Sequence, residues 1–325
     1  MIRTVTKHFS IVINFASICY EGMCVFPDFQ FQNDIQKLTI PEGVTTFGWC
    51  AFANSESLTE VTIPKSITDP GNHTFYGCMN LSKLHIYNDI IGEYQFSACW
   101  SLTDIIIPEN VTVIKEGGFG NCQGLKSVTF HNNLKEIGYQ AFYRCALTSV
   151  TIPESVETIG DAPFWECDKL MEFNGKFASG DKICLIADGR LVDVADGIVN
   201  ELSDYTIPAE VTHIGDSVFS NSSNLNSITI PEGVVDIGIC AFESCENLKE
   251  ITIPSTVTDI GVSAFSLCSK MSAIYFRGVT PPNVYEGGIY KGRHIATQGT
   301  IIRVPDEYID NYKNSSLWGD GWYTI

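Results

Sequence analysis

The sequence has few basic residues and no long apolar run. It holds 20 Lys and Arg residues against 38 Asp and Glu residues, which gives a formal charge of −18 at pH 7. Such a charge repels a phosphate backbone and an anionic lipid surface, so it argues against nucleic acid as a ligand. No apolar stretch reaches the roughly 18 residues that a transmembrane helix needs, which argues against direct insertion into a membrane.

Motifs of known catalytic and metal sites are also missing. The sequence has no H-E-x-x-H, G-x-S-x-G or Walker pattern, and no Cys and His residues at zinc spacing. We therefore predict no cofactor, no metal and no catalytic residue. Four carboxylates, Asp181, Asp188, Asp193 and Asp196, crowd one segment without EF-hand spacing. Turns and solubility explain them, and calcium binding is the alternative.

What the sequence does contain is an internal repeat of about 23 residues, marked by phenylalanine. The recurring positions are Phe52, Phe75, Phe96, Phe119, Phe142, Phe164, Phe219, Phe242 and Phe265. Only the interval from Phe164 to Phe219 departs strongly from the period. A glycine stands four residues before all but one of these phenylalanines, which predicts a recurring tight bend.

Each unit also contains the pattern L-x-x-V-x-I, usually followed by proline. The alternation is typical of a short strand with one buried face, and proline ends the strand because it lacks an amide donor. A unit of this size cannot bury its own apolar face, so the units must stack. We predict a right-handed, curved solenoid with a parallel sheet, little helix, and eleven strand rows from Leu38 to Phe276.

The stretch "LTEVTIPKSIT" at residues 58–68 resembles the BspA-like (Treponema pallidum-type) leucine-rich repeat of bacterial and protist surface proteins. The resemblance covers about residues 29–276. It implies an α/β-type leucine-rich-repeat solenoid, an extracellular or cell-surface location, and adhesion to proteins rather than catalysis. The end of the chain is similar to the C-terminal cap of that family, and the segment between Phe173 and Thr206 is similar to one of its insertions.

These observations divide the chain into three parts. Residues 1–28 form an N-terminal cap or a weak signal-like segment, and we favour a first strand that covers the end of the fold. Residues 29–276 form the solenoid, with a hairpin insertion at 174–206 that turns at Asp188 and Gly189. Residues 277–325 form the C-terminal cap, with a short helix that starts near Pro305.

The 12 cysteines follow the repeat rather than a disulfide pattern. Seven of them stand three residues after the recurring phenylalanine: Cys78, Cys99, Cys122, Cys145, Cys167, Cys245 and Cys268. Ser55 and Ser222 take the same place in the other two units, and serine replaces a small polar group but not half a bridge. We therefore predict a buried ladder of free thiols. A bridge between Cys19 and Cys24, outside the repeat, stays open.

The outward side chains of the predicted strands form the candidate binding face. Its residues are Glu60, Thr62, Lys83, His85, Asp104, Ile106, Thr129, Thr229, Thr252 and Tyr275. The expected ligand is a protein, such as an extracellular-matrix or host surface protein, and the acidic members would attract a basic patch on it. The alternative is that threonine reflects β-propensity and the charges are merely solvated.

Two other functions remain open, and the sequence does not fix the oligomeric state. One is a structural scaffold that self-associates through Trp49 and Trp100, provided that the two side chains cluster. The other is an enzyme with a site at the insertion, for which the sequence offers no nucleophile beside a base.

Overall fold

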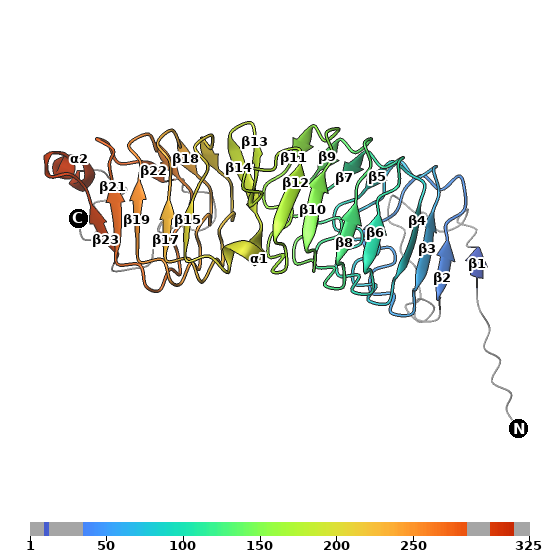
Figure 1. Ribbon diagram of the computed structural model, residues 1–325. Helices are drawn as coiled ribbons and strands as arrows, with labels where there is room; N and C mark the ends of the chain where they lie inside the picture. The colour runs from blue at the N-terminus through green and yellow to red at the C-terminus, as the bar shows by residue number, and fades with distance from the viewer. Residues whose placement is uncertain (1–9, 13–34, 285–299, 315–325) are drawn as a thin grey trace, which may run out of the picture. The chain divides into compact units, whose positions relative to one another are not determined.

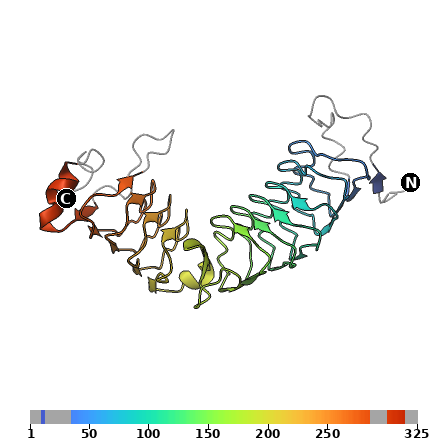
Figure 2. The ribbon, with the colours of Figure 1, turned by 90° about the horizontal axis from the view of Figure 1, so that it is seen from above.

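The computed structural model describes residues 10–12, 35–284 and 300–314 (Figure 1). The chain winds into coils of about 23 residues and divides into two compact units, Met1–Cys167 and Asp168–Ile325. Each unit is a parallel β-solenoid with very little helix, as the sequence predicted. Figure 2 shows the coils of each unit stacked one behind another.

In unit 1, most coils contribute a strand to each of two rows. The main row consists of β1 (Ser10–Val12), β2 (Lys37–Thr39), β3 (Glu60–Ile63), β4 (Lys83–Ile86), β6 (Asp104–Ile106), β8 (Ser127–Thr129) and β10 (Ser149–Ile152). The second row consists of β5 (Ile90–Ile91), β7 (Val113–Ile114), β9 (Glu136–Ile137) and β11 (Thr158–Ile159). β1 is the strand expected near the start of the chain, and it pairs in parallel with β2.

Unit 2 repeats the two rows and adds short helices. Its main row holds β12 (Glu172–Gly175), β15 (Asp204–Thr206), β17 (Ser227–Thr229), β19 (Glu250–Ile253), β21 (Ala273–Phe276) and β23 (Ile301–Arg303). Its second sheet holds β13 (Cys184–Ala187), β14 (Arg190–Val194), β16 (His213–Ile214), β18 (Asp236–Ile237), β20 (Asp259–Ile260) and β22 (Asn283–Val284). The helical elements are α1 (Asp196–Val199), the 3-10 turn η3 (Asp306–Tyr308) and α2 (Ile309–Lys313).

The eleven main-row strands expected between Leu38 and Phe276 are all present, but the second row was not expected. Its members are only two residues long in most coils, too short for alternation to show in the sequence. The main row is also interrupted: in unit 1, β4 ends one hydrogen-bonded ladder and β6 begins another. The intervening coil is short, since Phe96 follows Phe75 by 21 residues.

The hairpin predicted at the insertion is confirmed, and the hydrogen-bonded ladder of the main row breaks there, since β12 does not pair with β15. β13 and β14 are antiparallel, and Asp188 and Gly189 turn between them with φ angles of 50° and 78°. β14 then pairs in parallel with β16, with Leu191 opposite Ile214. Leu191 lies one repeat before Ile214 in the sequence, so the hairpin takes the place of a second-row strand.

The phenylalanines form a continuous stack inside each unit, which we call the Phe ladder. In unit 1 the neighbouring rings from Phe52 to Phe164 are nearly parallel, with centroids 5.3 to 5.6 Å apart. In unit 2 the Phe242 ring lies 5.2 Å from Phe219 and 5.3 Å from Phe265. All nine rings are buried. The recurring phenylalanine is therefore the centre of the core, as its periodicity predicted.

A tight turn starts at the recurring glycines, as predicted, since the amides of Ala241 and Ala264 donate to the carbonyl oxygens of Gly238 and Gly261. The reason for glycine itself is the close approach of the coils. At Gly238 a Cβ atom would lie 2.5 Å from the carbonyl carbon of Gly215, and at Gly261 it would lie 2.4 Å from that of Gly238. Neither glycine has a positive φ. At these two glycines the coils touch, and only a residue without Cβ fits between them.

Left-handed backbone occurs instead at two other positions, two residues before and two residues after each recurring phenylalanine. All of these φ angles lie between 50° and 70°, and only Gly77 and Gly117 are glycines. The geometry lets alternate amides donate to the next coil: around Phe242, the amide of Cys240 donates to Val262, that of Phe242 to Ala264 and that of Ser244 to Ser266. Hydrogen bonds between coils thus offset the strain of non-glycine residues.

Cysteines of the repeat donate their thiol protons to the coil before them, in a row that we call the thiol ladder. Cys122 Sγ lies 3.1 Å from the carbonyl oxygen of Phe96, and Cys245 Sγ lies 3.1 Å from that of Phe219. The ten cysteines in the described residues are all free, which confirms the thiol ladder there. Cys19 and Cys24 lie outside those residues. In the coil of Phe219, Ser222 stands in place of the cysteine. The coil before it lacks the recurring phenylalanine whose carbonyl oxygen would accept the thiol proton.

The end of the described chain closes the core of unit 2. A helix was expected near Pro305, and η3 and α2 begin there. Tyr312 is buried against Phe276, and its hydroxyl donates to the carbonyl oxygen of Gly278. β23 was not expected: it extends the main row beyond β21, although its sequence lacks the repeat pattern.

Replacing a ring of the Phe ladder should strongly destabilise the solenoid. We expect Phe242→Ala to lower the free energy of unfolding by about 3 to 5 kcal/mol, because it opens a cavity between two rings. Chemical denaturation monitored by circular dichroism measures the effect. A loss below about 1 kcal/mol would contradict a core role for the ladder.

Relieving left-handed strain should have the opposite effect. Leu267 has a φ of 59° and its side chain is 63% exposed, so Leu267→Gly removes a steric cost and little packing. We expect the free energy of unfolding to rise by about 1 kcal/mol. Glu246→Gly, at an exposed position without positive φ, is the matched control and should be destabilising. Equal losses in both variants would refute the strain.

The thiol ladder should resist thiol reagents in the native protein. Burial raises the pKa of the Cys122 thiol to about 12, and reagents attack the thiolate. We expect N-ethylmaleimide to label the partly exposed Cys50 and Cys240 first, and Cys122 only after unfolding. Peptide mapping by mass spectrometry reads out each site. Rapid native labelling of Cys122 would show that the ladder is open to solvent.

Candidate functional site

The outward residues of the main row are held in register by strand pairing. In unit 1, Thr62 lies opposite Thr39 on one side and His85 on the other. Farther along, Ile106 lies opposite Thr129. His85, Ile106 and Thr129 are exposed, and Thr62 is half-buried. The sequence therefore placed these side chains on the correct face.

Glu60 is in contact with Lys37 and with the predicted residue His85. Its carboxylate lies 2.8 Å from Lys37 Nζ and 3.4 Å from Nε2 of His85. The hydrogen bond from Lys37 is the main cause that lowers the pKa of Glu60. Lys83 is the register partner of Glu60 in β4, and its side chain is exposed. Glu60 is therefore a locally balanced charge, not an open acidic contact.

Asp104 accepts a hydrogen bond from a serine on the next coil. Ser127 Oγ donates to Asp104 Oδ1 at 2.6 Å, and this bond is the first cause that lowers the pKa of Asp104. Unit 2 repeats the arrangement, since Ser227 Oγ donates to Asp204. Sequence reasoning missed both serines as partners, although they stand one repeat after the aspartates.

In unit 2 the predicted residues Thr252 and Tyr275 border a hollow at the carboxyl ends of three strands. We call it the arginine hollow; its volume is about 450 Å³. It is lined by Thr252, Tyr275, Phe276, Arg277, Arg303, Val304 and Pro305. Arg303 lies opposite Tyr275 in the sheet, and its guanidinium carbon is 5.7 Å from the centre of the tyrosine ring. The sequence gave no signal for Arg303, because β23 lies outside the repeat.

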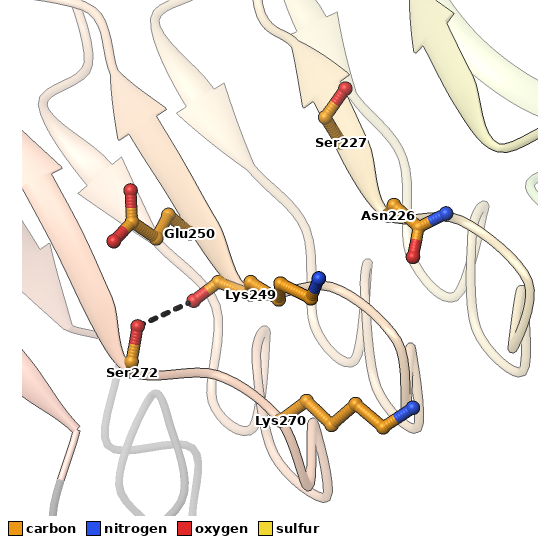
Figure 3. Close-up of a pocket in the computed structure, with 6 residues that line it drawn as sticks. All are labelled: Asn226, Ser227, Lys249, Glu250, Lys270 and Ser272. Carbon is orange, nitrogen blue, oxygen red and sulfur yellow. Dashed lines mark hydrogen bonds between the residues drawn. The ribbon is translucent and has the colours of Figure 1, made fainter.

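A second hollow, of about 580 Å³, lies at the amino ends of β17, β19 and β21 (Figure 3). We call it the lysine hollow, and its lining is Asn226, Ser227, Lys249, Glu250, Lys270 and Ser272. Lys249 and Lys270 extend toward the same side, and Ser272 donates its hydroxyl proton to the carbonyl oxygen of Lys249 at 3.2 Å (Figure 3). Thr229, also predicted, is exposed at the end of β17.

The hairpin brings together a polar cluster that the sequence did not predict. Tyr205 OH donates to Asp181 Oδ2 at 3.0 Å and lies 3.1 Å from Cys184 Sγ, while Ser179 Oγ donates to Asp181 Oδ1 at 2.5 Å. Burial raises the pKa of the Cys184 thiol to about 12, and the side chain is inaccessible. These groups fasten the hairpin to β15; they do not form an accessible nucleophile and base.

Two of the insertion aspartates are buried, which corrects their assignment to turns and solubility. Asp193 is 1% exposed and Asp196 is 5% exposed. Asp193 accepts a hydrogen bond from the backbone amide of Val194 at 2.9 Å. Within the part of the chain that the structure describes, no three His, Cys, Asp or Glu side chains are arranged to hold a metal ion.

The tryptophans considered for self-association occupy different positions on their coils. Trp49 stands three residues before its phenylalanine, and its ring centroid lies 6.4 Å from that of His73. His73 in turn stacks on Tyr94 at 4.8 Å. Trp100 stands four residues after its own phenylalanine. Both tryptophans are exposed, but Trp49 has joined an aromatic group that does not include the Trp100 position.

The repeat period, the strand rows and the core agree with a match to a known repeat family. The model of the BspA-type leucine-rich repeat region matches residues 26–103, 89–178 and 199–286, which is most of the chain. The chain belongs to the BspA-type leucine-rich-repeat family. Proteins built from leucine-rich repeats generally bind other proteins. A search of curated proteins found no match.

Two solved structures of bacterial proteins have a similar fold. A leucine-rich cell surface protein from Faecalibacterium prausnitzii has 22% sequence identity and a TM-score of 0.61, over 87% of this chain and 83% of that one. The pneumococcal vaccine antigen PcpA has 19% identity and a TM-score of 0.56, over 90% and 79% of the two chains. At such identities the likeness shows the BspA-type fold alone. Among the described residues, none of the helices has the length and apolar character to cross a membrane.

Proposed function

We propose that this BspA-type protein is a non-enzymatic recognition protein that binds a protein ligand through the outward residues of its main row. The proposed role is adhesion to host or neighbouring-cell proteins from an extracellular or cell-surface location. Support for that location comes from the description of the Faecalibacterium structure as a cell surface protein and of PcpA as a vaccine antigen.

The observation that carries the proposal is Ile106. Its side chain is 69% exposed on a sheet face where threonine is the usual residue. An exposed isoleucine adds nothing to the core of its own coil, which is already filled by Ile105 and Ile107. Burying it against a partner would gain about 1.5 to 3 kcal/mol, comparable to the contribution of an anchor residue in a protein interface.

We expect Ile106→Ala to weaken binding of the natural protein ligand about tenfold, because it removes the apolar anchor. The wild-type protein is first screened against an array of extracellular-matrix and cell-surface proteins. Saturable hits are then measured by surface plasmon resonance with wild type, Ile106→Ala, and the double variant His85→Ala with Ile106→Ala.

Ile239→Ala is the matched control. Ile239 is also exposed, but it stands three residues before Phe242 and outside the main row. It should bind within about twofold of wild type, because a rim or non-interface apolar residue contributes little. Equal weakening by both variants would refute a site on the main row. Absence of any hit, with light scattering that rises with protein concentration, would favour the self-associating scaffold.

A further inference from the structure

The two hollows of unit 2 carry a charge opposite to that of the whole chain. The chain has a formal charge of −18, yet the arginine hollow is lined by Arg277 and Arg303 with no carboxylate. The lysine hollow is lined by Lys249 and Lys270 with Glu250 as its single carboxylate. At such a local excess of cations, an anionic group of a ligand is attracted electrostatically and can also accept hydrogen bonds.

The arginine hollow has N–H donors that are available to a ligand. Arg277 Nη1 lies 3.4 Å from Glu232 Oε1, and the two side chains are 64% and 53% exposed, so the pair is weak and open to exchange. Arg303 lies against the Tyr275 ring, which orients its guanidinium without using its N–H donors. A guanidinium offers five N–H donors in a planar fork that fits a carboxylate. Thr252 adds a hydroxyl at the wall.

The lysine hollow also has few internal acceptors for its cations. Lys270 Nζ donates to the side-chain oxygen of Asn247, and Glu250 is the nearest lining acid. Both amines extend toward the same side in Figure 3, and the Glu250 carboxylate extends away from them. A second anionic group is the partner that balances this hollow.

The spacing of the hollows fits an extended peptide. β19 joins the two ends of the face: Lys249 precedes it, and Pro254, level with Arg277 in the sheet register, follows it. Five residues of strand span about 16 Å. A partner segment in the same extended conformation has side chains four residues apart on the same side, about 13 Å from each other. The long lysine and arginine side chains cover the remaining distance, so two acidic residues at this spacing reach both hollows.

We propose that the main-row face of unit 2 binds an extended acidic segment of the protein partner, with one carboxylate in the arginine hollow and a second in the lysine hollow. The inference rests on the proposed function, because it names the chemistry of the partner. It modifies the expectation of a basic partner patch for this unit.

The test uses a fluorescein-labelled peptide, Asp-Ser-Ser-Ser-Asp with both termini blocked, and the same peptide with both aspartates replaced by asparagine. Fluorescence anisotropy at low and at moderate salt measures binding to the full chain. We expect saturable binding of the acidic peptide, loss of binding with the asparagine peptide, and weakening by added salt, since the contacts are ionic.

Four variants locate the site. Arg277→Gln with Arg303→Gln should weaken binding about tenfold, and Lys249→Gln with Lys270→Gln about fivefold. If the double arginine variant does not fold, binding is measured with Arg303→Lys instead, which keeps the charge. Lys135→Gln, an exposed cation of unit 1, is the matched control and should leave binding unchanged. Equal loss in the control, or equal binding of both peptides, overturns the proposal.

A blocked glucuronate oligosaccharide completes the experiment. Binding of that sugar without binding of the acidic peptide would overturn the peptide partner in favour of an acidic glycan. Failure of the peptide leaves the Ile106 test in unit 1 unaffected, so the two proposals fail separately.

Discussion

Hydrogen bonding between consecutive coils is the constraint on which the rest of this structure depends. Each coil must offer its alternate amides to the next coil, as Cys240, Phe242 and Ser244 do. That requirement fixes the distance between coils, so side chains one repeat apart lie above one another. The stacked rings, the thiol protons bonded to carbonyl oxygens of the preceding coil, and the glycines without room for Cβ are consequences of the same spacing.

The sequence predicted what is periodic and what is local. The main row, the Phe ladder and the thiol ladder repeat often enough to be recognised, and the Asp188-Gly189 turn is encoded by two adjacent residues. The second row was missed because two-residue strands show no alternation. The left-handed positions were missed because side chains such as Tyr94 and Leu267 have no preference for that conformation; contacts between coils impose it.

For the candidate site, sequence reasoning identified the outward residues but not their partners. Strand alternation alone placed His85 and Ile106 on the exposed side of the main row. The pairing of Glu60 with Lys37 could have been found, since the two residues stand one repeat apart. Arg303 could not, because β23 carries no repeat signal, and its position beside Tyr275 depends on how the end of the chain returns to the sheet.

Formal charge is therefore a poor guide to which partner each face prefers. Glu60, Asp104 and Asp204 all have a lowered pKa, and in each case the first cause is a hydrogen bond from a neighbouring side chain. Acceptor oxygens that are already engaged offer less to a basic ligand than their number suggests. The cations of the two hollows are engaged less fully than these acids. In unit 2 the N–H donors of these cations favour an acidic ligand, even though acidic residues outnumber basic ones along the chain.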